Sequence, residues 1–147
     1  MQDNTSKDTL SSYPVIYPAI RRDINQALIV DDDLNIRALV SFYLKKFCDS
    51  DYVENGLNAL EAAMSIKYDL ILMDIDLGYG MNGIEVSRNI RRLPGYKKTP
   101  IIAMSASTEP GIKNRCLDAG MDLFIPKPFY KKQLLNEIEN VLKEKTK

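Results

Sequence analysis

Acidic, hydroxyl and amine side chains follow four short apolar runs of this sequence. They are Asp31, Asp32 and Asp33 after 27–30, Asp74 and Asp76 after 70–73, Ser105 and Ala106 after 101–104, and Lys127 after 123–125. Carboxylates held within a few ångströms repel one another, and a hard cation with oxygen ligands relieves the repulsion. Mg²⁺, or Mn²⁺ in its place, suits such a set and also recruits phosphate oxygens. A carboxylate can attack phosphorus, so the set predicts phosphoryl transfer to an aspartate.

Composition excludes several other chemistries. The chain contains no histidine, so it offers no imidazole base, His-ligated zinc or phosphohistidine. Its two cysteines, Cys48 and Cys116, lie far apart and are expected to be reduced and buried. Twenty basic residues balance twenty acidic ones, so bulk charge gives no argument for binding nucleic acid or membrane.

Each of these polar residues also has a purely structural explanation. An Asp or Ser after a strand commonly caps the next helix, and Asp33 is expected to do only that. Lys127 taken alone would be an ordinary solvated lysine. Polar groups at four of five predicted strand ends favour a functional site, because ligands of open α/β sheets bind beyond the carboxyl ends of the strands.

The elements that must position these residues follow a repeating pattern. Apolar runs at 27–30, 70–73, 101–104 and 123–125 predict strands, and 51–54, which ends at Asn55-Gly56, predicts a weaker one. Between and after them, apolar spacing of three and four predicts amphipathic helices. The inward residues expected are Ile36, Leu39, Val40, Tyr43, Leu44 and Phe47, then Leu60, Ala63 and Met64, then Val86, Ile90 and Leu93, and finally Leu134, Leu135, Ile138, Val141 and Leu142. Strand and helix in alternation predict a parallel sheet with helices on both faces.

Length and terminal segments suggest the domain organisation. A chain of 147 residues fits one domain. We expect an N-terminal arm over 1–25, partly disordered, and a single domain over 26–147. No apolar run approaches the length of a membrane span, and the N-terminus lacks a signal pattern. A cytoplasmic location is therefore expected.

Four short segments carry a family resemblance. The segments IVDDD at 29–33 with Arg37, LILMD at 70–74, AMSA at 103–106 and IPKPF at 125–129 resemble the receiver domain of two-component response regulators, over about residues 26–145. The resemblance implies a flavodoxin-like doubly wound (βα)5 fold with strand order 2-1-3-4-5. It also implies a signalling domain, which catalyses only its own phosphorylation and dephosphorylation and is not otherwise an enzyme.

The resemblance assigns roles by position. Asp31 and Asp32 match the acidic metal-binding pair, Asp74 the phosphorylated aspartate, Asp76 the backbone carbonyl that completes the Mg²⁺ shell, Lys127 the lysine in a usually cis Lys–Pro bond, Ser105 and Phe124 the switch pair, and Ala106 the small residue lining the site. Three departures stand out. Gly83 follows Asp74 by nine residues where many members have eight, Leu77-Gly78 replaces Met-Pro, and Phe124 lacks a tyrosine hydroxyl.

The expected partners follow from the same resemblance. With no histidine of its own, the chain needs an external phosphohistidine, on a sensor histidine kinase or a histidine phosphotransfer protein. The docking residues expected are Leu34, Asn35, Arg37, Ala38, Pro128 and Phe129. The chain ends soon after the fifth helix, so we expect no output domain on it, an unknown downstream protein as target, and a monomer or weak homodimer. It could be a stand-alone protein or the receiver of a hybrid kinase.

Two alternatives compete with this interpretation. The segment LILMDID resembles the DxD motif of haloacid-dehalogenase-type phosphatases, but that class places its acidic pair late, after the lysine. The other alternative is a receiver-like interaction module that is never phosphorylated. The presence of every residue that the chemistry needs argues against it.

Overall fold

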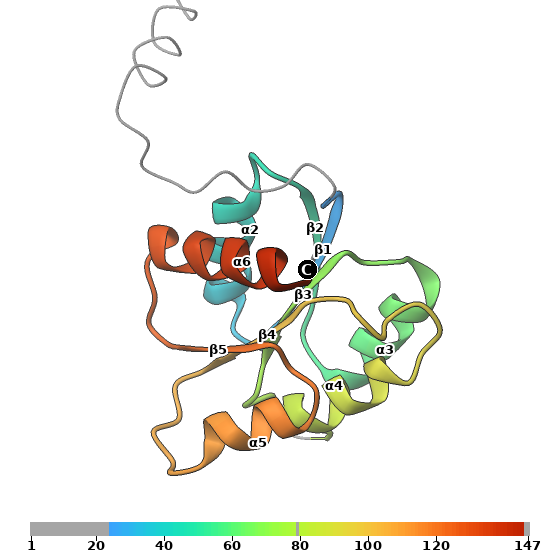
Figure 1. Cartoon of the computed structure of the whole chain (residues 1–147), viewed down its shortest axis with the longest axis vertical. Helices are drawn as coiled ribbons and strands as arrows, with labels where there is room; N and C mark the ends of the chain where they lie inside the picture. The colour runs from blue at the N-terminus through green and yellow to red at the C-terminus, as the bar shows by residue number, and fades with distance from the viewer. Residues whose placement is uncertain (1–23, 79, 146–147) are drawn as a thin grey trace, which may run out of the picture.

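A computed structural model of the chain describes residues 24–78 and 80–145, which form one parallel sheet with helices on both faces (Figure 1). The five strands run in the order β2-β1-β3-β4-β5. In chain order the elements are β1 (Gln26–Val30), α2 (Leu34–Leu44), β2 (Asp49–Val53), α3 (Gly56–Ser65), β3 (Leu70–Asp74), α4 (Gly83–Arg91), β4 (Ile101–Ser105), α5 (Ile112–Asp118), β5 (Leu123–Pro126) and α6 (Lys131–Lys145). The predicted flavodoxin-like fold and strand order are confirmed. The arm predicted over 1–25 lies outside the described residues, except for its last two.

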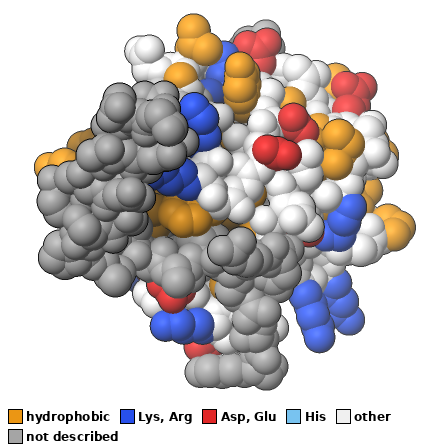
Figure 2. Space-filling view, turned by 90° about the horizontal axis from the view of Figure 1, so that it is seen from above, with side chains coloured by type: hydrophobic (Ala, Val, Ile, Leu, Met, Phe, Trp, Pro, Cys, Tyr) orange, Lys and Arg blue, Asp and Glu red, His pale blue; other side chains and the backbone are white. Residues whose placement is uncertain are grey.

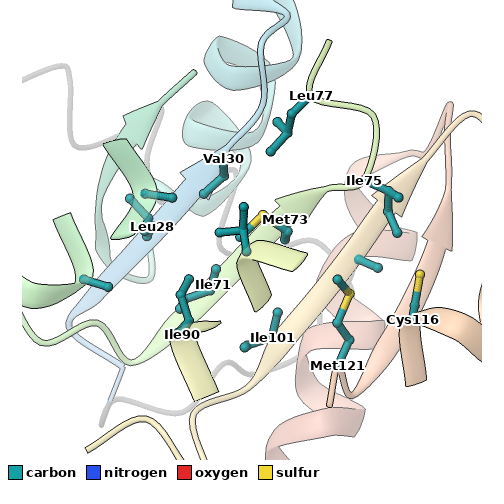
Figure 3. Close-up of a cluster of buried hydrophobic side chains, with 14 of the residues drawn as sticks. Leu28, Val30, Ile71, Met73, Ile75, Leu77, Ile90, Ile101, Cys116 and Met121 are labelled. Atoms are coloured by element: carbon teal, nitrogen blue, oxygen red, sulfur yellow. The ribbon is translucent and has the colours of Figure 1, made fainter. Parts of the chain in front are cut away.

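Two hydrophobic cores lie on opposite faces of the sheet. Helices α2 and α6 cover one face, and α3, α4 and α5 cover the other (Figure 1). Successive strand residues point to opposite faces, so Leu28 of β1 joins the core under α3 and α4 while Ile29 joins the core under α2 and α6. Figure 3 shows the first core, in which Ile90 of α4 lies beside Ile71 of β3, with Ile101 of β4 nearby. Because both faces are covered, β3 and β4 are buried along their whole length.

Side-chain caps fix where three helices begin. Asp33 accepts a hydrogen bond from the Asn35 amide at the start of α2, which confirms its predicted capping role. Asn55 caps α3 in the same way. Asn82 and Glu85 form a capping box at the start of α4, each side chain accepting from the other's backbone amide. These caps hold the loops after β1, β2 and β3 in place at the edge of the sheet where the polar residues gather.

Element bounds differ from the predicted ones by one or two residues. Asp74 and Ser105 are the last residues of β3 and β4, whereas the apolar runs ended one residue earlier. Strand β2 spans Asp49–Val53 and therefore begins two residues before the predicted run. It is an edge strand with partly exposed residues, so its polar start carried no apolar signal.

The inward residues of α6 are all buried as predicted, but two others are not. Met64 of α3 is 65% exposed and Leu39 of α2 is 37% exposed, so both predictions were wrong. Each residue of a helix is rotated about 100° from the last, so Met64 turns away from the sheet when Ala63 faces it. For the same reason Leu39 of α2 lies at the edge of the buried helix face that includes Val40.

The surface shows isolated apolar side chains. Figure 2 shows one face, where, outside the grey atoms, hydrophobic side chains lie among polar and charged ones. No helix among the described residues has the length and apolarity needed to cross a membrane. Both predicted free thiols are free; Cys116 is buried and Cys48 half-buried.

Candidate functional site

The carboxyl ends of three central strands bring the predicted polar residues together. Strands β1, β3 and β4 are neighbours and parallel, so their ends share one edge of the sheet. Asp31 follows β1 directly, while Asp74 and Ser105 end β3 and β4. Lys127 follows β5, and its amide donates to the Ser105 carbonyl, which fixes the lysine beside β4.

Three carboxylates form a group that fits a hard cation. Oxygens of Asp31, Asp32 and Asp74 lie within 4.8 Å of one another. Asp31 and Asp74 are buried, whereas Asp32 is exposed at the mouth of the site. Such a mixture of buried and open oxygen ligands suits Mg²⁺, which keeps several waters when bound. The donor set therefore fits the predicted ion.

Lys127 balances part of this negative charge. Its ammonium lies 2.8 Å from Asp31 Oδ2 and 3.4 Å from Asp74 Oδ1. Burial acts to lower the pKa of Lys127, but the hydrogen bond to Asp31 and the two carboxylate charges outweigh it and raise the pKa above its usual value. The lysine therefore stays charged, with donors beside the carboxylate expected to react.

The carboxyl group of Asp74 is strongly perturbed. Burial, followed by the charge of Asp31, raises the pKa of Asp74 to about 7. The backbone amide of Asp76 donates to Asp74 Oδ1 at 3.0 Å and, with Lys127, acts in the opposite direction. In the absence of a cation, burial and the charge of Asp31 therefore disfavour the ionised form of Asp74.

Ser105 is held by two hydrogen bonds. Its hydroxyl donates to Asp76 Oδ2 at 3.0 Å and accepts from the Ser107 amide at 3.0 Å. The sequence predicted the position of Ser105 but gave no partner for its hydroxyl. The only signal was that Asp76 lies between two apolar residues, Ile75 and Leu77, which is typical of a side chain facing the other way from both.

The lengthened loop after β3 leaves the start of α4 in close contact with the strand. The Gly83 amide donates to the Ile75 carbonyl at 3.0 Å, and a Cβ at Gly83 would overlap the Asp74 carbonyl oxygen. Gly78, with φ +80°, takes the left-handed turn that passes beside the Asp32 carboxylate. A pocket of about 370 Å³ lies between Asp32, Asp76 and this loop. Gly83 therefore contacts the end of β3 even with the extra residue in the loop.

The remaining predicted residues are those beside the site and those of the proposed docking surface. Ala106 is exposed beside Ser105, and Phe124 is half-buried and packs against the core under α3, α4 and α5. The Lys127–Pro128 peptide bond is cis, as the resemblance implied. Of the predicted docking residues, Leu34, Asn35, Ala38 and Pro128 are exposed and Arg37 is half-buried.

Phe129 does not lie at that surface. Its side chain is only 6% exposed and packs in the core under α2 and α6. The following residue, Tyr130, is 80% exposed and was not among the predicted docking residues. An aromatic pair at the end of a loop gave no signal for which ring would turn inward.

Comparisons with known proteins agree with this geometry. A family model described as "Response regulator receiver domain" matches residues 27–139. The chain is 37% identical over 117 residues to the transcriptional regulatory protein ResD of Bacillus subtilis, covering 79% of this chain and 47% of ResD. It is 34% identical over 120 residues to SrrA of Staphylococcus aureus, covering 81% of this chain and 48% of SrrA. The chain thus spans about half the length of these curated relatives.

Solved structures give the same result. The chemotaxis protein CheY4 of Vibrio cholerae superposes with a TM-score of 0.75 at 29% identity, covering 80% of this chain and 98% of CheY4. The receiver domain of the sensor histidine kinase PA1611 of Pseudomonas aeruginosa superposes with a TM-score of 0.73 at 28% identity, covering 81% of this chain and 98% of that domain. That second structure is described as having a magnesium ion coordinated in the active-site cleft.

Proposed function

This chain belongs to the response regulator receiver domain family of two-component systems, and on that premise we propose that Asp74 accepts a phosphoryl group from a phosphohistidine partner. The observation that carries the proposal is the meeting of Asp31, Asp32, Asp74 and Lys127 at one edge of the sheet. Three acids with one ammonium can hold a cation and a phosphoryl group together. No other cluster of three metal-ligating side chains occurs in the part of the chain that the structure describes.

The residues present define how a metal would be held. Asp31, Asp32 and Asp74 would supply carboxylate oxygens, and Asp76 its backbone carbonyl, to Mg²⁺ or Mn²⁺. When bound, the ion supplies positive charge against the phosphoryl oxygens and favours the ionised form of Asp74. The magnesium ion reported for the similar PA1611 domain supports this assignment.

The transfer step needs few groups. One oxygen of the Asp74 carboxylate attacks phosphorus, the bond from phosphorus to the donor's imidazole nitrogen breaks, and the donor imidazole takes up a proton from solvent and leaves neutral. Lys127, already 3.4 Å from Asp74, offers its ammonium to the transferred oxygens. Ala106 leaves room beside the site because its side chain is a single methyl.

The signal would leave the site through Ser105 and Phe124. A phosphoryl group on Asp74 offers oxygens that draw the Ser105 hydroxyl inward. Phe124 then fills the space that the hydroxyl leaves, and the surface of α5, β5 and α6 changes. An unidentified downstream protein would recognise that surface, with the chain a monomer or weak homodimer in the cytoplasm.

The donor would dock beside the site. Leu34 is 63% exposed at the start of α2, next to Asp33 and close in sequence to the acidic pair. Asn35, Arg37, Ala38 and Pro128 complete the proposed surface, while Phe129 supports it from within the core. A helix bearing phosphohistidine, from a kinase or a phosphotransfer protein, could lie across this surface with its imidazole near Asp74.

Labelling of the acceptor tests the proposal. Full-length chain incubated with acetyl phosphate and Mg²⁺ is expected to gain one phosphoryl group, and Asp74→Asn to gain none. Asp33→Asn is the matched control, because it keeps a capping oxygen and lies outside the carboxylate cluster. Label that persists in Asp74→Asn would refute the assignment. Sustained turnover of p-nitrophenyl phosphate would instead support the phosphatase alternative.

A further inference from the structure

We propose that the Asp76 carboxylate holds Ser105 in its unphosphorylated position and so sets how readily the chain responds to phosphorylation. This inference rests on the proposed function for the response itself, but the contact on which it depends exists without phosphorylation. Asp76 acts here through another residue and is a positioning residue. Its backbone carbonyl remains the proposed metal ligand, and its side chain has this second role.

The first step is that the Ser105 hydroxyl both donates and accepts a hydrogen bond in the unphosphorylated chain. Its single proton goes to Asp76 Oδ2 at 3.0 Å, and it accepts the Ser107 amide at 3.0 Å. Ser105 is fully buried, so water does not reach its hydroxyl freely, whereas the Asp76 carboxylate at the other end of the first bond is exposed. A hydrogen bond to a charged acceptor is stronger than one between neutral groups. The hydroxyl is therefore held in one orientation.

The second step is that the neighbours of Asp76, in the segment that follows β3, fix its position. Ile75 and Leu77 are each only 4% exposed and point into the core, as Figure 3 shows. Asp76 lies between them with an exposed side chain, and its Oδ2 accepts from Ser105 instead of entering that core. Its amide also donates to Asp74 Oδ1 at 3.0 Å. Asp76 thus contacts the acceptor through its backbone and the hydroxyl through its side chain.

The third step is competition for one proton. The Ser105 hydroxyl cannot donate to Asp76 and to a phosphoryl oxygen on Asp74 at the same time. The Asp76 carboxylate also carries negative charge beside an arriving dianion, and like charges disfavour each other. Both effects favour the unphosphorylated state. Asp76→Asn separates the two effects, because it keeps an acceptor oxygen and removes the charge.

The direct test observes the Ser107 amide in the unphosphorylated, full-length chain by ¹H–¹⁵N NMR. The Ser105→Ala variant gives the reference position of the Ser107 amide resonance when the hydroxyl that accepts its hydrogen bond is absent. In Asp76→Ala the resonance is expected to move toward the Ser105→Ala position, because the serine loses its anchor. In Asp76→Asn it should stay near the wild-type position. A resonance that remains at the wild-type position in Asp76→Ala overturns the proposal.

A second measurement tests the consequence for the response, using beryllofluoride as the phosphoryl mimic. Asp76→Ala is expected to bind it about threefold more tightly than Asp76→Asn, a modest factor for a hydrogen bond whose carboxylate is exposed. That ratio should fall to one in a Ser105→Ala background. If Asp76→Ala still binds beryllofluoride about threefold more tightly than Asp76→Asn when Ser105→Ala is also present, Asp76 does not act through Ser105. If wild-type Asp74 is not labelled by acetyl phosphate, the proposed function fails, whereas the amide measurement still decides the role of Asp76.

Discussion

Lys127 lies closer to Asp31 than to Asp74, at 2.8 Å from Asp31 Oδ2 against 3.4 Å from Asp74 Oδ1. The lysine is thus paired mainly with a carboxylate that is proposed to hold the metal, and only secondarily with the proposed nucleophile. Asp31 is fully buried, so removing its partner would leave a charged group without compensation. This relationship makes Lys127 important both before and during transfer.

Replacing Lys127 should therefore slow phosphorylation and move its pH dependence. Lys127→Met removes the donor near the transferred oxygens and is expected to slow labelling by acetyl phosphate on the order of 100-fold. The charge of Lys127 also lowers the pKa of Asp74, so its loss should shift the pH midpoint of the rate upward. Initial rates from pH 6 to 9 at fixed Mg²⁺ measure both effects. Lys131→Met serves as a control on α6, and a rate equal to wild type in Lys127→Met would contradict the role.

The pKa of Asp74 predicts how stability depends on pH. In the metal-free protein that pKa is raised from 3.8 to about 7, so the folded state binds more protons than the unfolded state between these values. This contribution makes stability fall as pH rises from 4 to 7, and the penalty is complete above 7. Asp74→Asn should then stabilise the metal-free protein at pH 8 by roughly 4 kcal/mol at most, since the rise of that pKa from 3.8 to about 7 corresponds to about 1.4 kcal/mol per pKa unit.

Urea unfolding in EDTA measures this difference at pH 8 and at pH 4, where it should largely vanish. Excess Mg²⁺ should also reduce it at pH 8, because a bound cation favours the ionised carboxylate. An Asp74→Asn gain that is the same at both pH values would mean that burial of the charge is not its cause.

The metal site predicts a contrast between two adjacent aspartates. Asp32→Ala removes one of the three clustered carboxylates and is expected to weaken Mg²⁺ binding at least about tenfold. Asp33→Ala removes only the cap of α2 and should cost about 1 kcal/mol of stability with little change in Mg²⁺ affinity. Calorimetric titration and urea unfolding separate the two effects. Equal Mg²⁺ affinity in the two variants would contradict the assignment.

The docking surface predicts selective loss of transfer. Ala38→Trp places a bulky side chain among the exposed residues of α2, so transfer from the cognate phosphohistidine donor should slow about tenfold or more, as for a truncated contact of 1–2 kcal/mol. Labelling by acetyl phosphate should be unchanged, since the small donor needs no docking surface. Met64→Trp on α3, on the other face of the sheet, is the matched control. Equal slowing with both donors would indicate damage to the site or the fold.

Much of this site could be predicted because two separate features of the sequence indicate where each strand ends. Apolar runs locate β1, β3 and β4, and the polar residues that follow mark where each strand ends, so Asp31, Asp74 and Ser105 were placed correctly. Side-chain partners were not predictable in this way. The bond from Ser105 to Asp76 depends on side-chain orientation in three dimensions, which no linear spacing encodes. Similarly, nothing in the order Phe129-Tyr130 indicates that the first ring enters the core and the second faces solvent.

The last prediction concerns Gly80, in the loop after β3, and Gly83, at the start of α4, because the two positions require glycine for different reasons. A Cβ at Gly83 would overlap the Asp74 carbonyl oxygen, and the nearest atoms are all backbone, which cannot rotate away. Gly80 has φ +82° but open space where a Cβ would stand, with nothing within 4 Å, so its constraint is conformational only. Gly80→Ala should cost about 1–2 kcal/mol, the usual penalty of a left-handed residue with a side chain.

Gly83→Ala should cost more than Gly80→Ala and should also impair function, because it forces the start of α4 away from the strand end that carries Asp74. Urea unfolding is expected to give a loss on the order of 3 kcal/mol or more, in the range of overpacked cores. Labelling by acetyl phosphate at a temperature where both variants remain folded should fall for Gly83→Ala and stay near wild type for Gly80→Ala. Equal losses in both assays would mean that the close approach of Gly83 to Asp74 is not what positions the acceptor.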